Sequence, residues 1–147
     1  MKGNIKSASV AQVMLSTFDD FETKKSGLTI TDTDGNFNIT LSEKFTGTAL
    51  LDVEGQGQLL LLLNDEDVSF TADNLQDFST LKFLESKENK AFSDYINYLT
   101  DYQLKSNGLN WLLEKYEEED PFYSVLKTEK IRIDKVNEDF LEKLPND

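Results

Sequence analysis

The period of the apolar residues changes near residue 85, and this change constrains the fold more than any other feature of the sequence. Before it, apolar side chains alternate with polar ones, as in residues 28–33, 37–41 and 68–72, which is typical of half-buried β-strands. After it, they recur every three or four residues, which is typical of amphipathic helices. We therefore expect an α+β chain: an N-terminal antiparallel β-sandwich-like unit over residues 1–84, followed by a helical segment of two to three helices over residues 85–147.

Turn signals divide the first part into short strands. Strands are expected at residues 3–6, 11–17, 28–33, 37–41, 47–53, 58–63, 68–72 and 80–84. Asp34-Gly35 suits a tight turn, because glycine takes a positive φ at no steric cost, and predicts a hairpin over residues 28–41. The run from Gln58 to Leu63 is continuously leucine after its first residue, which predicts a strand covered on both faces, with helical residues as the second cover.

Capping residues mark the helices of the second part. Ser86 can accept a backbone amide hydrogen bond and start the first helix, and Asn107-Gly108 is expected to end it. Residues 109–119 then predict a short second helix. Asp120-Pro121 restarts the chain as a long amphipathic helix that reaches Leu144 and is stopped by Pro145. The apolar residues that mark this helix are Phe122, Val125, Leu126, Ile133, Val136, Phe140 and Leu144.

Composition excludes several kinds of chemistry. The 147 residues carry a net charge of −13, which repels nucleic-acid phosphates and anionic membrane surfaces. The chain has no cysteine and no histidine, so thiol nucleophiles, disulfides, Ser-His-Asp relays and nearly all zinc sites are excluded. The longest apolar run, residues 59–63, is far too short to cross a bilayer. We expect no catalytic residues, no cofactor and no metal.

The acidic residues offer three weaker alternatives. Residues 32–36 resemble the start of a calcium loop, with Glu43 at the twelfth position. Gly35 stands fourth instead of sixth, and residues 37–41 alternate as a strand, so the hairpin is favoured. The clusters at residues 65–67 and 117–120 could bind a cation weakly, although solvated turns and helix ends explain them better. A carboxylate pair for glycoside hydrolysis stays open, but no pair stands out.

Aromatic residues are dense in the helical part: Phe92, Tyr95, Tyr98, Tyr102, Trp111, Tyr116, Phe122 and Tyr123. Core packing between helices and sheet explains most of them, and a recognition surface is the alternative. Tyr98 and Tyr123 fall off the main apolar stripes, so they are the possible interface residues.

The order of these features resembles a known family, carried by turn, hairpin and cap residues over nearly the whole chain. The matching residues are Gly3-Asn4-Ile5-Lys6, Ala8, residues 13–15, residues 34–39, Gly47 with Leu50, residues 59–62, residues 65–68, Ser86 with Glu88-Asn89, and Phe92 with Tyr95. The family is the domain of unknown function that precedes a thioredoxin-like domain in Gram-negative envelope proteins similar to thiol–disulfide oxidoreductases. None of the matching positions is catalytic in that family, and the Cys-x-x-Cys of a thioredoxin-like domain is absent from these residues.

The resemblance implies a function and a location. It implies a non-catalytic accessory or binding module that positions a protein partner or mediates homodimerisation, with a C-terminal thioredoxin-like domain in the full-length protein. It also implies the cell envelope or periplasm, although this chain shows no signal-peptide pattern. The alternative is a stand-alone envelope protein that binds a small ligand or a protein. A pocket lined by several of the aromatic residues would favour that alternative.

Overall fold

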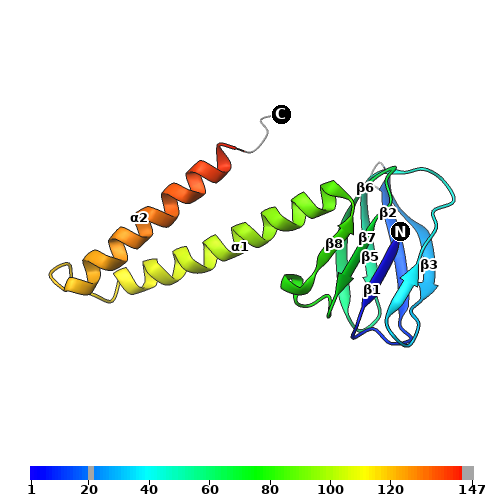
Figure 1. Cartoon of the computed structure of the whole chain (residues 1–147), viewed down its shortest axis with the longest axis horizontal. Coiled ribbons are helices and arrows are strands. Elements are labelled where there is room, and N and C mark those ends of the chain that lie inside the picture. Colours follow the sequence, from blue (N-terminus) through cyan, green and yellow to red (C-terminus); the bar gives the residue numbers. More distant parts are fainter. Residues whose placement is uncertain (20–21, 144–147) are drawn as a thin grey trace. The chain divides into compact units, whose positions relative to one another are not determined.

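Two four-stranded sheets are followed by two long helices in the computed structural model, which describes residues 1–19 and 22–143 (Figure 1). The strands are β1 (Lys2–Ile5), β2 (Gln12–Asp19), β3 (Glu22–Ile30), β4 (Asn36–Asn38), β5 (Thr46–Val53), β6 (Gly57–Asn64), β7 (Ser69–Ala72) and β8 (Lys82–Glu85). The helices are α1 (Lys87–Leu113) and α2 (Pro121–Leu141), with a short 3-10 helix η1 (Phe78–Thr80). The predicted α+β class, with a β-sandwich-like unit before a helical segment, is confirmed.

The strands pair in the orders β4-β1-β7-β8 and β3-β2-β5-β6. Every pairing is antiparallel except that of β1 with β7, which is parallel. The unit is therefore antiparallel in large part, and not throughout as we expected. Parallel neighbours need a long connection, and here β2 to β6, the whole second sheet included, lie between β1 and β7 in the chain.

The core lies between the two sheets, where the alternating apolar residues meet. Val13, Leu15, Leu51 and Leu61 from one sheet are fully buried, as are Ile5 and Phe70 of the other. Phe70 contacts Phe37 edge-on and lies tilted against Phe83, with ring centroids 5.9 and 5.8 Å away. Burying side chains of this size stabilises the fold by roughly 1.5–3 kcal/mol each.

The predicted hairpin over residues 28–41 is wrong. β3 pairs with β2 in one sheet, and β4 pairs with β1 in the other, so the chain crosses between sheets at residues 31–35. Buried Thr31 follows β3 at the end of the second sheet, where its backbone N–H and its hydroxyl donate to the carbonyls of Ala11 and Ala8 at 2.9 and 2.6 Å. The turn itself is present, with Gly35 at φ 80°. Turn chemistry was visible in the sequence, whereas the choice of strand partner was not.

The leucine strand β6 is buried on one face only. Leu59, Leu61 and Leu63 point into the core, while Leu60 is 42% exposed and Leu62 is half-buried on the outer face. Within residues 1–94 the start of α1 does not supply the second cover that we expected for this face.

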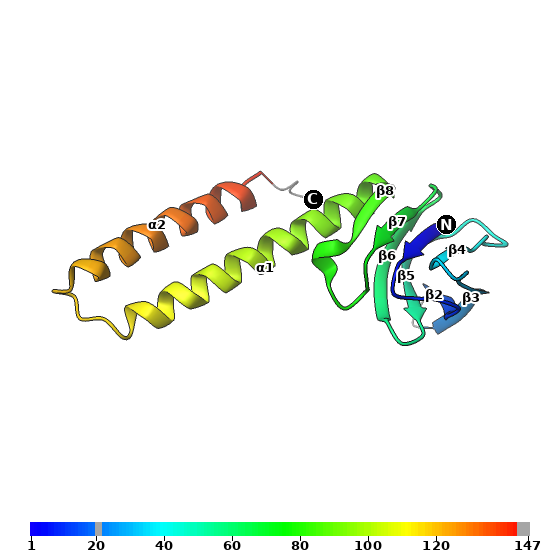
Figure 2. The same ribbon diagram turned by 60° about the horizontal axis from the view of Figure 1, so that its bottom comes forward.

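The helical segment has two helices, because α1 continues through Asn107-Gly108 to Leu113. A glycine within a helix costs only about 1 kcal/mol relative to alanine, which the flanking turns outweigh. α2 begins as predicted: Asp120 caps it by accepting a 2.8 Å hydrogen bond from the N–H of Phe122, with Pro121 at the first position. α2 ends at Leu141 with Glu142 as its C-cap, so the helix is shorter than the predicted one that reaches Leu144. Leu144 and the predicted stop at Pro145 lie outside the described residues. α1 and α2 run side by side in opposite directions (Figure 2).

The chain divides into two compact units, Met1–Asp94 and Tyr95–Asp147, so the boundary falls inside α1 and not at residues 84/85, where we placed it. The first turn of α1 belongs to the sandwich because Asn89 is buried against β6. Its side-chain amide donates to the carbonyl of Leu62 at 2.6 Å and accepts from the N–H of Leu62 at 2.8 Å. Ser86, the predicted cap, accepts from the side chain of Asn89 at 2.7 Å and donates to Glu66 at 2.6 Å.

Candidate functional site

A hollow of about 620 Å³ opens at one end of the sandwich. It lies where the start of β1, the β4–β5 connection and the β6–β7 connection meet. Its apolar floor comes from the core, and its rim is polar and charged. The lining residues are Met1, Lys2, Leu15, Asn38, Thr40, Leu41, Ser42, Glu43, Lys44, Phe45, Leu63, Asp65, Glu66, Asp67 and Val68.

Two connections border this hollow and are held together across it. Lys44, in the connection before β5, forms an ion pair with Asp65, in the connection after β6. The backbone N–H of Lys2 donates to the carbonyl of Val68 at 2.8 Å and fixes the second connection to β1. Both members of the ion pair are well exposed, so water screens it and it stabilises the loops only weakly.

The lining of the hollow mixes apolar side chains with charged ones. Its floor is apolar while four carboxylates and two lysines stand on its rim, and such a mixture binds by shape and charge. Two of these carboxylates already have partners, since Asp65 pairs with Lys44 and Glu66 accepts from Ser86. None of the aromatic residues that we expected to favour a ligand pocket lines it; Phe45 is its aromatic residue.

Residues 32–36 form a turn that is stabilised by hydrogen bonds within these five residues. The carboxylate of Asp32 accepts hydrogen bonds from the backbone N–H groups of Asp34 and Asn36, each at 2.9 Å, and from the side chain of Asn36. The side-chain hydrogen bond from Asn36 and the backbone ones hold the pKa of Asp32 below its usual value. In the described part of the chain, no group of three or more acidic residues could hold a metal ion. These residues therefore form a turn, but not within the hairpin that the sequence favoured over a calcium loop, because the strands on either side of the turn pair in different sheets.

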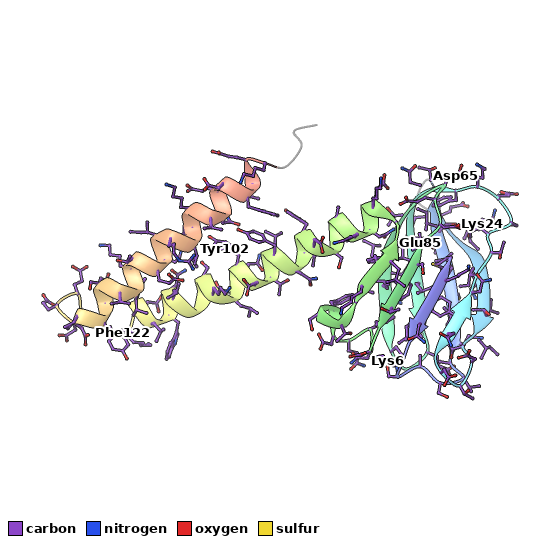
Figure 3. The ribbon with its side chains drawn as sticks, viewed as in Figure 1. Lys6, Lys24, Asp65, Glu85, Tyr102 and Phe122 are labelled. Carbon is purple, nitrogen blue, oxygen red and sulfur yellow. The ribbon has the colours of Figure 1, made fainter. Side chains whose placement is uncertain are left out.

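The helical hairpin of residues 95–141 packs through a seam of residues three and four apart. Leu126 and Ile133 are its buried apolar side chains in the described range. Tyr102 donates a 2.9 Å hydrogen bond from its hydroxyl to Asp134, reaching from α1 to α2 (Figure 3). The ammonium of Lys130 also donates to Asp134, and this bond, with the Tyr102 hydroxyl as a smaller contributor, lowers the pKa of that carboxyl. The side-chain oxygen of Asn137 is buried without a hydrogen-bond partner, so the seam is partly polar.

The two predicted interface residues both lie on the hairpin and are both half-buried. Tyr98 stacks on Phe140 with ring centroids 3.8 Å apart, so much of its ring is used within the hairpin. Tyr123 lies in the first turn of α2, and the structure does not bring it together with Tyr98. The interface role of both residues stays a prediction.

Other aromatic and apolar side chains of the helices are more exposed than these two. Packing was expected for Phe92, Trp111, Tyr116 and Phe122, yet 37–59% of each is exposed. Val125, Ile131 and Val136 of α2 are exposed to a similar extent, and sequence reasoning assigned Val125 and Val136 to the same helix stripe as the buried residues. Their spacing relative to Leu126 and Ile133 was the signal that could have separated the two flanks of α2.

No helix in the described ranges is both long enough and apolar enough to cross a membrane. Comparison of the chain with protein families, with curated proteins and with solved structures gave no match.

Proposed function

We propose that the chain is a non-catalytic binding and positioning module, with the sandwich as a stable body and the helical hairpin as the interaction element. One observation carries the proposal: the contrast in burial between the units. Among the described residues, eighteen apolar side chains form the sandwich core, whereas the hairpin buries Leu126 and Ile133. A helical pair with so small a core and so many exposed apolar side chains is typical of an element that packs on a partner.

The finer part of the proposal is an accessory role in a cell-envelope thiol–disulfide oxidoreductase. The resemblance of the turn, hairpin and cap residues supports it, and the absence of cysteine means that any redox chemistry belongs to another part of the protein. The hairpin would then position a protein partner, or a second copy, beside a thioredoxin-like domain.

The native gene on both sides of this segment tests the accessory role. We expect a signal peptide upstream and a thioredoxin-like stretch with Cys-x-x-Cys downstream. Leu104 and Trp111 of α1 are 70% and 59% exposed, so both are available to a partner. In that full-length protein, Leu104→Gln with Trp111→Gln should slow reduction of a protein disulfide while reduction of a small disulfide stays the same. Gln103→Ala, on the same helix, is the control. A gene that ends at residue 147 would contradict the accessory role.

The second candidate function is a stand-alone protein that binds a small amphipathic ligand, and the hollow of about 620 Å³ favours it. A panel of amphipathic small molecules, screened by chemical-shift changes, should then perturb residues 41–45 and 65–68. Lys44→Ala should alter the response because Lys44 stands on the rim. Lys6→Ala is the matched control, because Lys6 forms its ion pair with Asp73 away from the hollow. If Lys44→Ala leaves the chemical-shift changes unaltered, the ligand does not bind at this hollow.

A further inference from the structure

α2 carries a second stripe beside the flank that faces α1. Phe122, Val125, Glu129, Arg132, Val136 and Phe140 follow one another at spacings of three or four residues, so they share one flank of the helix. Phe122, Val125 and Val136 are 43%, 58% and 46% exposed. The stripe extends along nearly the whole of a 21-residue helix, a length of roughly 30 Å.

The middle of the stripe holds two opposite charges that point to the same side. The guanidinium of Arg132 donates to both carboxylate oxygens of Glu129, from Nε at 2.7 Å and from Nη2 at 2.6 Å. Their side chains are 62% and 44% exposed, for Arg132 and Glu129 respectively. This bidentate bond lowers the pKa of Glu129 and raises that of Arg132, so both stay charged at neutral pH.

The order of residues along the stripe is nearly the same in both directions. From the midpoint between residues 130 and 131, each direction meets a charged residue, then a valine, then a phenylalanine. The two charges have opposite signs. A surface with this pattern is complementary to itself when it is turned by 180°, as the interface of a two-fold dimer requires.

We propose that α2 is a homodimerisation helix, in which two copies of the chain pair antiparallel through this stripe. With the two-fold axis between residues 130 and 131, Val125 meets Val136 of the second copy, and Phe122 reaches toward Phe140 of that copy. Glu129 meets Arg132 of the second copy twice, once on each side of the axis. Tyr98, stacked on Phe140, borders each end of the contact.

A second copy fits this flank because the two-fold axis places Glu129 of each copy opposite Arg132 of the other, so each charge faces a charge of opposite sign. The pairing also supplies what the hairpin lacks, since two seams that each bury two apolar side chains would become one four-helix arrangement. In it, the valines and phenylalanines of the two stripes pack on both sides of the central charges. The inference depends on the proposed function in one respect: it takes the hairpin as the interaction element.

Sedimentation of the chain over a wide concentration range tests the dimer. We expect a reversible monomer–dimer equilibrium. Glu129→Arg places four arginines at the two-fold axis, and Arg132→Glu places four glutamates there, so each variant should raise the dimer Kd at least about tenfold. An equimolar mixture of the two variants should restore dimers, because each arginine of one variant then meets a glutamate of the other.

Matched variants separate the stripe from the rest of α2. Lys127→Glu changes the charge as Arg132→Glu does but lies on another flank, and Ile131→Lys adds a lysine at a residue 61% exposed on the opposite flank. Both should dimerise like the unaltered chain, whereas Val125→Lys should not. Circular dichroism checks that every variant keeps its helices.

Three outcomes would overturn the inference: a chain that is monomeric at all concentrations, charge variants that dimerise as well as the unaltered chain, or a mixture of folded variants that forms no dimers. A monomeric chain would not contradict the proposed binding module, which the gene sequence and the disulfide-reduction assay test separately. If the chain dimerises but the gene encodes no thioredoxin-like domain after it, the accessory role in an envelope oxidoreductase is contradicted and the homodimer is supported.

Discussion

At the scale of single residues, Gly35 lies in the connection between β3 and β4, where the chain passes from one sheet to the other. Its φ is 80°, and its carbonyl accepts a 3.0 Å hydrogen bond from the N–H of Ile5. A Cβ at this position would overlap the carbonyl oxygen of Ile5. The position therefore excludes a side chain for two reasons, strain and space.

We predict that Gly35→Ala lowers the free energy of unfolding by about 1–3 kcal/mol or more, because the strain of positive φ adds to a clash with backbone that cannot move away easily. Gly55→Ala is the matched control, since Gly55 has φ 72° but no atom within 4 Å of the added Cβ. Thermal melting measures both. Equal losses in Tm would mean that the clash contributes nothing.

A second prediction at this scale concerns Asp134 and acid. The hydrogen bonds from Lys130 and from the Tyr102 hydroxyl favour the charged carboxylate, so its pKa is lower in the folded chain than in the unfolded chain. The stabilisation is therefore complete above the unfolded pKa of about 4 and is lost as the pH falls through the lower folded pKa.

Urea unfolding of the helical signal should accordingly show a midpoint that falls with acidification below about pH 4. In Asp134→Asn this fall should be smaller, and stability at neutral pH should be lower. Glu138→Gln, an exposed position on the same helix, should leave the pH profile unchanged. A profile that Asp134→Asn does not alter would contradict the assignment.

At the scale of elements, the sequence predicted where most strands and helices are but not which of them pair. Turn signals located β5, the leucine run located β6 and alternation located β7, each closely, and Asp120-Pro121 located the start of α2, because these signals are local. The partners of β3 and β4 depend on Thr31 bonding to Ala8 and Ala11, more than twenty residues away in the first case. Which flank of α2 is exposed depends in the same way on its packing with α1, so residue spacing can separate the two flanks but does not say which of them is covered.

The junction between β6 and α1 gives the prediction at this scale. Asn89→Ala removes both hydrogen bonds between the side chain of Asn89 and the backbone of Leu62. The N–H and the carbonyl of Leu62 then lose their present partners. We expect a loss of about 1–3 kcal/mol in unfolding free energy and faster amide hydrogen exchange at Leu62. Lys90→Ala, at the neighbouring exposed residue, is the control. Unchanged exchange at Leu62 would mean that Asn89 does not hold the junction.

At the scale of the whole molecule, the boundary inside α1 separates what each unit needs to fold. Residues 86–89 are helical or helix-capping, yet their hydrogen bonds go to β6 and to the connection after it. A fragment of residues 1–94 should therefore melt cooperatively near the temperature of the sandwich in the full chain. A fragment of residues 1–85, cut where the sequence pattern changes, should melt at a lower temperature. Equal melting of the two fragments would place the boundary back at the change of pattern.

The bond between Asn89 and Leu62 has a consequence for the solubility of the chain. β6 is an edge strand with five consecutive leucines, the kind of segment that recruits further strands into amyloid-like stacks. A side-chain amide occupies the N–H and carbonyl at Leu62 that an incoming strand would need, and it does so without offering a new edge. The start of α1 therefore blocks the addition of a further strand at Leu62. If these hydrogen bonds were lost, we expect aggregation to begin at β6.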